Sequence, residues 1–207
     1  MSKGFAVAAT VSVAALVAGA VLLTTVMAPA DRFADCRTSV VAGGPSSIGG
    51  PFSLINQDSQ PVTDQDIITE PTLIYFGYTF CPDVCPLDLA RNVEAIDILE
   101  TEQGKIVKPV FISIDPERDT PEVVGDFAAN HHPRMVGLTG SEEQVAAASK
   151  TFKTFYQRQD DDPDYYLINH STLSYLVFPE DGFVQHFDRT LRPDQMAQQL
   201  SCFLDAA

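Results

Sequence analysis

Apolar residues follow two different patterns along this chain. In some stretches they run almost continuously, as in strands buried on both faces, and in others they recur every three or four positions, as in helices. Strands are therefore predicted at TLIYFGY (72–78), PVFISID (109–115), MVGLTG (135–140), TLSYLVF (172–178) and FVQHF (183–187). Helices are predicted over 87–100, over 121–132, from 141 onward and from 193 onward.

Turn signals complete the order of the elements. FSLINQDSQPVTDQD (52–66) predicts a hairpin ahead of the first long strand, and PEDG (179–182) predicts a turn between the last two strands. The order is a hairpin, three strand–helix units, a second hairpin and a final helix. This order predicts an α/β fold with a mixed central sheet flanked by helices. In such folds the functional site lies where a strand passes into a helix.

The N-terminal region differs in character from the rest. Residues 5–28 include no charged side chain, and these 24 residues exceed the roughly 20 that span a membrane as a helix. We predict a single membrane anchor at 1–30, a linker rich in Gly, Ser and Pro at 31–50, and a folded domain at 51–207. A cleavable signal peptide is the alternative, because Ala28-Pro29-Ala30 resembles a cleavage site. Lys3 predicts a cytoplasmic N-terminus and an exported domain, which fits a bacterial inner membrane with the domain in the periplasm.

Charge narrows the classes of partner. The net charge is −15 and the pI about 4.4, with only 13 Lys and Arg residues and no basic cluster. Nucleic-acid binding is therefore not expected, since it depends on basic groups that neutralise phosphates. The acidic surface fits a cation, a positively charged partner or solubility alone.

Two cysteines occupy the first strand-to-helix transition. Cys81 and Cys85 follow the strand 72–78, and Asp83 is the predicted N-cap of the next helix. The unpaired amides of a helix N-terminus favour thiolates, so this is a reactive pair. It is consistent with a redox couple, a metal site or a structural disulfide, although closing so short a loop stabilises a fold little.

The spacing of the pair favours a metal site. C-x-x-x-C has one residue more than the usual redox motif, and two soft thiolates select Cu(I) or zinc. Structural zinc needs four ligands, so copper with a third ligand fits better. Of the four histidines, His131 and His132 lie at a helix end and His186 lies within a strand. His170 precedes the strand 172–178 and is the candidate third ligand.

Three motifs resemble those of the Sco/SenC family of copper-binding proteins. They are YFGYTFCPDVCP (75–86), VFISIDPERDTPE (110–122) and INHSTLSYLVFPEDG (168–182), and with their spacing the resemblance covers 51–204 and the N-terminal anchor. It implies a thioredoxin-like fold that binds one copper ion, Cu(I) or Cu(II), through Cys81, Cys85 and His170. It also implies a role in assembling the CuA centre of cytochrome c oxidase.

Other residues of these motifs carry further implications. The family usually has aspartate where this chain has Asn169, which removes a charge beside the candidate ligand. Asp115 and Asp119 of DPERDT have been discussed as carboxylates that support the site, but a strand end and a helix cap explain them equally well.

The resemblance leaves two functions open. One is a metallochaperone rather than an enzyme, with the copper-bearing oxidase subunit, a periplasmic copper donor and a thioredoxin-like reductant as partners. The other is a thiol–disulfide oxidoreductase that uses Cys81 and Cys85 to reduce its target. His170 separates them, because only the copper site needs it. Outside the motifs, we predict a disulfide between Cys36 and Cys202 that ties the linker to the last helix.

Overall fold

The structure is a computed structural model and describes residues 31–37, 44–159 and 165–207. The chain divides into two units, Met1–Ala34 and Asp35–Ala207. Of the first unit only Asp31–Ala34 are described, and there the amide of Ala34 donates to the Asp31 carbonyl. None of the helices formed by the described residues combines the length and hydrophobicity that a membrane span requires. The predicted anchor, residues 1–30, lies outside the described residues.

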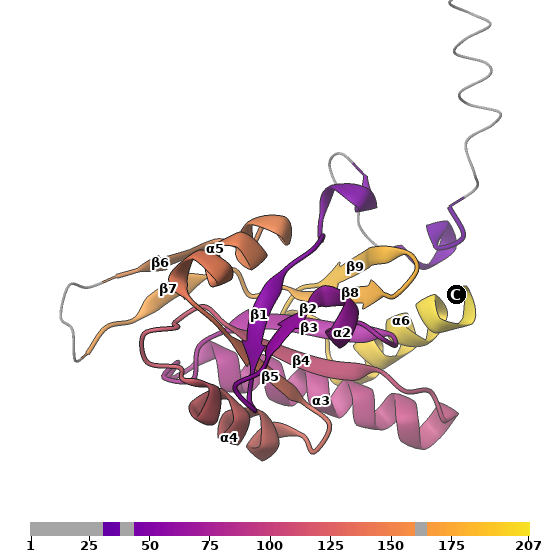
Figure 1. Ribbon diagram of the computed structural model, residues 1–207. Helices are drawn as coiled ribbons and strands as arrows, with labels where there is room; N and C mark the ends of the chain where they lie inside the picture. Colours follow the sequence, from indigo (N-terminus) through magenta and orange to yellow (C-terminus); the bar gives the residue numbers. More distant parts are fainter. Residues whose placement is uncertain (1–30, 38–43, 160–164) are drawn as a thin grey trace, which may run out of the picture. The chain divides into compact units, whose positions relative to one another are not determined.

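Nearly all of the regular structure formed by the described residues lies in the second unit (Figure 1). The strands are β1 (Ser53–Asn56), β2 (Pro61–Thr63), β3 (Thr72–Gly77), β4 (Lys108–Ser113), β5 (Val136–Thr139), β6 (Tyr156–Arg158), β7 (Ile168–His170), β8 (Ser174–Phe178) and β9 (Gly182–Phe187). The α-helices are α2 (Asp64–Ile67), α3 (Val84–Gln103), α4 (Pro121–His131), α5 (Glu142–Thr151) and α6 (Pro193–Asp205). Two short 3₁₀ turns, η1 (Ala34–Cys36) and η2 (Pro45–Ser47), precede them.

Seven strands form one mixed sheet in the order β2-β1-β5-β4-β3-β8-β9. The central strands β3, β4 and β5 are parallel, whereas β1 pairs antiparallel with β5, and β8 pairs antiparallel with both β3 and β9. All six residues of β3 are buried, as its continuous apolar sequence predicts. The predicted α/β fold with a mixed central sheet is thus confirmed.

The helices bury the sheet. The parallel crossovers through α3 and α4 place these helices on the same face, because such connections are right-handed. There α3 contacts both α4 and α6, while α5 lies apart from them and contacts β1 (Figure 1). Beneath α5 the core is aromatic, with the rings of Phe76 and Tyr175 packed edge to face at 5.9 Å. The strands β3 and β4, whose ends lead to the site, are therefore buried within the domain.

A second, two-stranded sheet was not predicted from the sequence. β6 and β7 pair antiparallel, with Tyr156 opposite His170, and neither strand joins the seven-stranded sheet. Each strand has only three residues, which is too few for an alternating pattern to stand out. His170 lies just before β8, as predicted, and it is also the last residue of β7.

A disulfide joins the segment before the sheet to the last helix. Cys36 and Cys202 are bonded, with their Cα atoms 5.7 Å apart, and 166 positions separate them in the sequence. Cys202 lies in α6, whose buried face is formed by neighbouring residues such as Met196, Leu200 and Phe203. The bond closes almost the entire second unit into a loop, so it strongly restricts the unfolded chain.

Replacing both Cys36 and Cys202 by serine should lower the free energy of unfolding by about 2–4 kcal/mol, because the unfolded chain regains the freedom of a long loop. Urea unfolding followed by circular dichroism measures the change. Wild-type protein reduced with dithiothreitol is the matched control and should unfold at the urea concentration of the variant. Equal unfolding free energies for the variant and the oxidised wild type would show that the bond contributes nothing.

Candidate metal centre

The two sequence-predicted cysteines flank the start of α3. After β3 the chain turns, with the amide of Cys81 bonded to the Tyr78 carbonyl at 3.2 Å, and α3 begins at Val84. Asp83 occupies the N-cap position as predicted, but its side chain makes no capping hydrogen bond. Instead the amide of Cys85 donates to Cys81 Sγ at 3.3 Å. The first turn of the helix is therefore capped by a sulfur.

His170 completes the cluster from the end of β7. Its Nε2 atom lies 3.3 Å from Cys85 Sγ, and one ligand atom from each of Cys81, Cys85 and His170 lies within 4.8 Å of the others. Among the described residues this is the group of His, Cys, Asp and Glu side chains arranged to hold a metal ion. The structure thus brings together three side chains, of which the first, Cys81, and the last, His170, are 89 positions apart in the sequence.

The imidazole of His170 is oriented by its other nitrogen. Nδ1 lies 2.8 Å from the Ser171 carbonyl oxygen, which can only accept, so Nδ1 carries the proton. Nε2 then presents its lone pair to the sulfurs, as a metal-binding histidine must. Tyr75 and Tyr78 contact the ring in T-shaped geometry at 6.2 and 5.9 Å and restrict its rotation.

The two thiols differ in acidity. A hydrogen bond from the Cys85 thiol is the main cause that lowers the pKa of Cys81 to about 3, against the opposing effect of burial. Hydrogen bonds from the amides of Asp83 and Cys85 lower this pKa further. The pKa of Cys85 is raised, because its proton is held by Cys81 and because it is fully buried. The pair therefore shares one proton and carries one negative charge at neutral pH.

Cys85 fits beneath the site because β3 ends in glycine. A Cβ atom at Gly77 would lie 3.0 Å from Cys85 Sγ and 2.9 Å from the Tyr75 ring. Tyr75 in turn donates its hydroxyl proton to buried Asp88 at 2.9 Å. Gly77 was not identified from the sequence, although a glycine that ends a buried strand is the signal that would have marked it.

The loop from Ile114 to Thr120, called here the β4–α4 loop, contacts both parts of the site. Asp119 is fully buried, and its carboxylate accepts bonds from the Thr79 amide, the Thr79 hydroxyl and the Ser113 hydroxyl at 3.0, 2.5 and 2.6 Å. Asp115 pairs with Arg118 at 2.6 Å. Neither carboxylate caps α4, a role that Thr120 fills. Both support the loops around the site without joining the ligand cluster.

The remaining histidines lie elsewhere. His131 bonds the Phe127 carbonyl within α4, as expected at a helix end, and His186 is half-buried on β9. His132 is the C-cap of α4, which confirms the prediction of a helix end, but it is buried and not on the surface, with its Nε2 3.4 Å from an Asp97 oxygen. None of them belongs to the ligand cluster.

The donor set fits a soft metal ion. Two sulfurs and one imidazole are the ligands preferred by Cu(I), and a site of only three donors does not satisfy structural zinc. Both cysteines are buried, and Cys81, at 9% exposure, is the more exposed of the two. Calcium and magnesium are excluded by the absence of oxygen ligands in the cluster.

Comparison with known proteins gives a consistent result. The SCO1/SenC family pattern matches residues 41–205. Protein SenC of Rhodobacter capsulatus is 45% identical over 205 residues, which cover 99% of this chain and 92% of SenC. The mitochondrial SCO1 homolog 1 of Arabidopsis thaliana is 39% identical over 75% of this chain, which spans 46% of that relative's length. The crystal structure of Arabidopsis thaliana ScoI with copper bound is similar with a TM-score of 0.73 and 37% identity, covering 76% of this chain and 99% of that one.

Cys81 should react with iodoacetamide well before Cys85 in the reduced protein, because its lowered pKa keeps it a thiolate whereas Cys85 is protonated and buried. The rate at Cys81 should stay nearly constant from pH 5 to pH 8, instead of rising tenfold per pH unit as for an ordinary thiol. Mass spectrometry of peptides after timed quenching measures both sites. A rate at Cys81 that rises throughout this range would contradict the assignment.

Proposed function

The chain belongs to the SCO1/SenC family, and from this premise we propose that it binds one copper ion through Cys81, Cys85 and His170. The observation that carries the proposal is the convergence of these three donors at the end of β3. A structurally similar family member is described with copper bound. The two thiolates would supply the strong soft ligands, and His170 Nε2 the third.

The proposed role is that of a copper metallochaperone for the CuA centre of cytochrome c oxidase, as the family resemblance implies. Copper is then cargo that the protein receives from a donor and releases to the copper-bearing oxidase subunit. Three ligands suit this task, because an incoming ligand from a partner can approach the ion from the side of Cys81, the more exposed of the two cysteines. Residues 1–30 would anchor the protein in the bacterial inner membrane and place the domain in the periplasm, where a thioredoxin-like reductant keeps the pair reduced.

A second proposed function is thiol–disulfide exchange with the target. The lowered pKa of Cys81 beside a buried, protonated Cys85 is the arrangement of an attacking thiolate and a resolving thiol. In this reaction Cys81 attacks a target disulfide and Cys85 then displaces the reduced target. The Cys81–Cys85 disulfide forms as the target gains two electrons. Copper binding needs both cysteines in the reduced form, so a molecule with the Cys81–Cys85 disulfide cannot hold copper. One molecule therefore cannot perform both functions at the same time.

Replacing His170 by alanine should abolish tight one-to-one copper binding, because two thiolates alone leave the ion without its third donor. Copper content after dialysis against a Cu(I) chelator, measured on the reduced full-length protein, tests this. The matched control is His186→Ala, which removes a half-buried histidine from a strand outside the cluster and should bind copper like the wild type.

The same variants separate the two functions. Exchange with a model disulfide peptide should continue at the wild-type rate in His170→Ala if the cysteines act in thiol–disulfide exchange, since that reaction does not use the imidazole as a ligand. Wild-type copper affinity in His170→Ala would disprove the three-ligand site. A wild-type protein that holds no copper would disprove the proposed copper function and leave thiol–disulfide exchange to be judged by the peptide assay.

A further inference from the structure

The two-stranded sheet that carries His170 is joined to the rest of the domain by side-chain contacts, both polar and apolar, and not by strand pairing. β6 and β7 pair only with each other, so no backbone ladder joins them to the seven-stranded sheet. On the C-terminal side only Ser171, Thr172 and Leu173 separate His170 from β8. On the N-terminal side, Tyr166 and Ile168 are buried, whereas the other described residues of 165–169 are exposed. The position of the imidazole therefore depends on what holds these two.

Tyr166 makes the larger set of contacts. Its hydroxyl donates to Asp115 Oδ1 at 2.5 Å and lies 3.4 Å from Glu117 Oε2. The guanidinium carbons of Arg118 and Arg158 each lie 3.5 Å from the centre of its ring. Two guanidinium groups at this distance would overlap if both lay over the same face of the Tyr166 ring. The two arginines therefore lie over opposite faces, and the ring is stacked between two cations.

The backbone at Tyr166 is held as well. Arg118 Nη1 donates to the Tyr166 carbonyl at 3.1 Å, and Arg118 Nε is paired with Asp115. Two residues further on, the Ile168 amide donates to the Tyr78 hydroxyl at 3.2 Å. Tyr78 is the same residue whose ring contacts His170. A short continuous chain of contacts thus runs from the β4–α4 loop through Tyr166 to the imidazole.

The β4–α4 loop also holds the cysteine side of the site. Asp119, four positions after Asp115, fixes Thr79 two positions before Cys81. One loop therefore contacts both ligand-bearing segments, the cysteine loop through Asp119 and the β6–β7 sheet through Asp115 and Arg118. A fixed distance between the sulfurs and the imidazole follows if both sets of contacts are intact.

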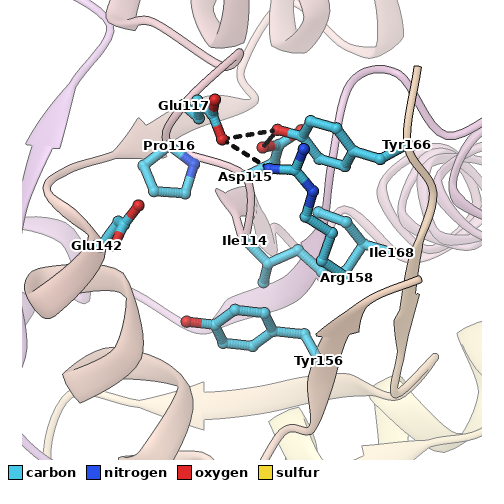
Figure 2. Close-up of a pocket in the computed structure, with 9 residues that line it drawn as sticks. All are labelled: Ile114, Asp115, Pro116, Glu117, Glu142, Tyr156, Arg158, Tyr166 and Ile168. Atoms are coloured by element: carbon cyan, nitrogen blue, oxygen red, sulfur yellow. Dashed lines mark hydrogen bonds and ion pairs between the residues drawn. The ribbon is translucent and has the colours of Figure 1, made fainter. Parts of the chain in front are cut away.

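A pocket lies beside Tyr166, so the packing around this side chain is incomplete on that side. Its volume is about 200 Å³, and its lining includes Ile114, Glu142, Tyr156 and Tyr166 (Figure 2). Figure 2 also shows Arg158 and Glu117 beside the Tyr166 hydroxyl, where the marked interactions converge. Because space remains next to the ring, the segment can shift when the polar contacts are lost.

We propose that Tyr166 is a positioning residue for His170, which sets the distance between the imidazole and the cysteine pair through its contacts with the β4–α4 loop. The inference rests on the proposed copper function, because it concerns the third ligand of that site. Tyr166 does not touch the metal and acts through the segment that bears the ligand.

The test compares Tyr166→Phe and Tyr166→Ala with Tyr156→Phe in the reduced full-length protein. Tyr156 lines the same pocket from β6, and its hydroxyl makes no hydrogen bond within the described part of the chain, so it is the matched control. Copper affinity, measured by competition with a Cu(I) chelator, should fall about tenfold to a hundredfold in Tyr166→Ala. Loss of the single hydroxyl bond in Tyr166→Phe should lower it about threefold to tenfold, and Tyr156→Phe should stay within about twofold of the wild type.

Amide hydrogen exchange of metal-free protein supplies an independent readout. The Ile168 amide should exchange faster in both Tyr166 variants, while amides of β3 should keep wild-type protection because the central sheet is untouched. Unchanged copper affinity and unchanged Ile168 exchange in Tyr166→Phe would overturn the inference and leave the copper proposal standing. If the wild type itself holds no copper, the proposed function fails, and the exchange rate of Ile168 still decides whether Tyr166 fixes this segment. If Tyr166→Ala does not fold, Tyr166→Phe decides both measurements.

Discussion

The site depends first on one buried carboxylate. Asp119 is fully buried and accepts three hydrogen bonds, two from Thr79 and one from Ser113. Ser113 ends β4 and Thr79 follows β3, so the carboxylate joins the ends of two parallel strands. A buried carboxylate that loses such partners is strongly destabilising, so the bonds form together and fix the loop that leads to Cys81. The position of the sulfurs is thus set by the sheet and not by the loop alone.

Strand pairing brings the distant ligand to the same place. β3 and β8 are antiparallel neighbours, with Tyr75 opposite Ser174 at the end of the ladder. The chain that leaves β3 reaches Cys81 within a few residues, and the chain that enters β8 has just passed His170. Both ligands therefore lie beyond one end of the same strand pair. A separation of 85 positions between Cys85 and His170 becomes a distance of 3.3 Å between Sγ and Nε2.

The sequence predicts the parts of this site that depend on strong local patterns. Long apolar strands and the cysteines beside a helix start are visible in it, and so is a lone histidine before β8. The β6–β7 sheet was missed because three-residue strands leave no periodic signal. Tyr166 was missed because its role comes from Arg118 and Arg158, which are brought around its ring only by folding. Gly77 was missed because its lack of a side chain matters only once Cys85 lies above it.

The two proposed functions share one physical origin. Cys85 is fully buried and protonated, whereas Cys81 has a lowered pKa and is the more exposed of the two. A partner therefore meets Cys81 first, whether the partner brings a metal ion or a disulfide. Copper binding then requires Cys85 to give up its proton, and disulfide formation requires it to give up its proton and bond to Cys81. Both reactions therefore depend on the buried thiol of Cys85. The redox state of the pair decides whether Cys81 can complete copper binding or disulfide exchange.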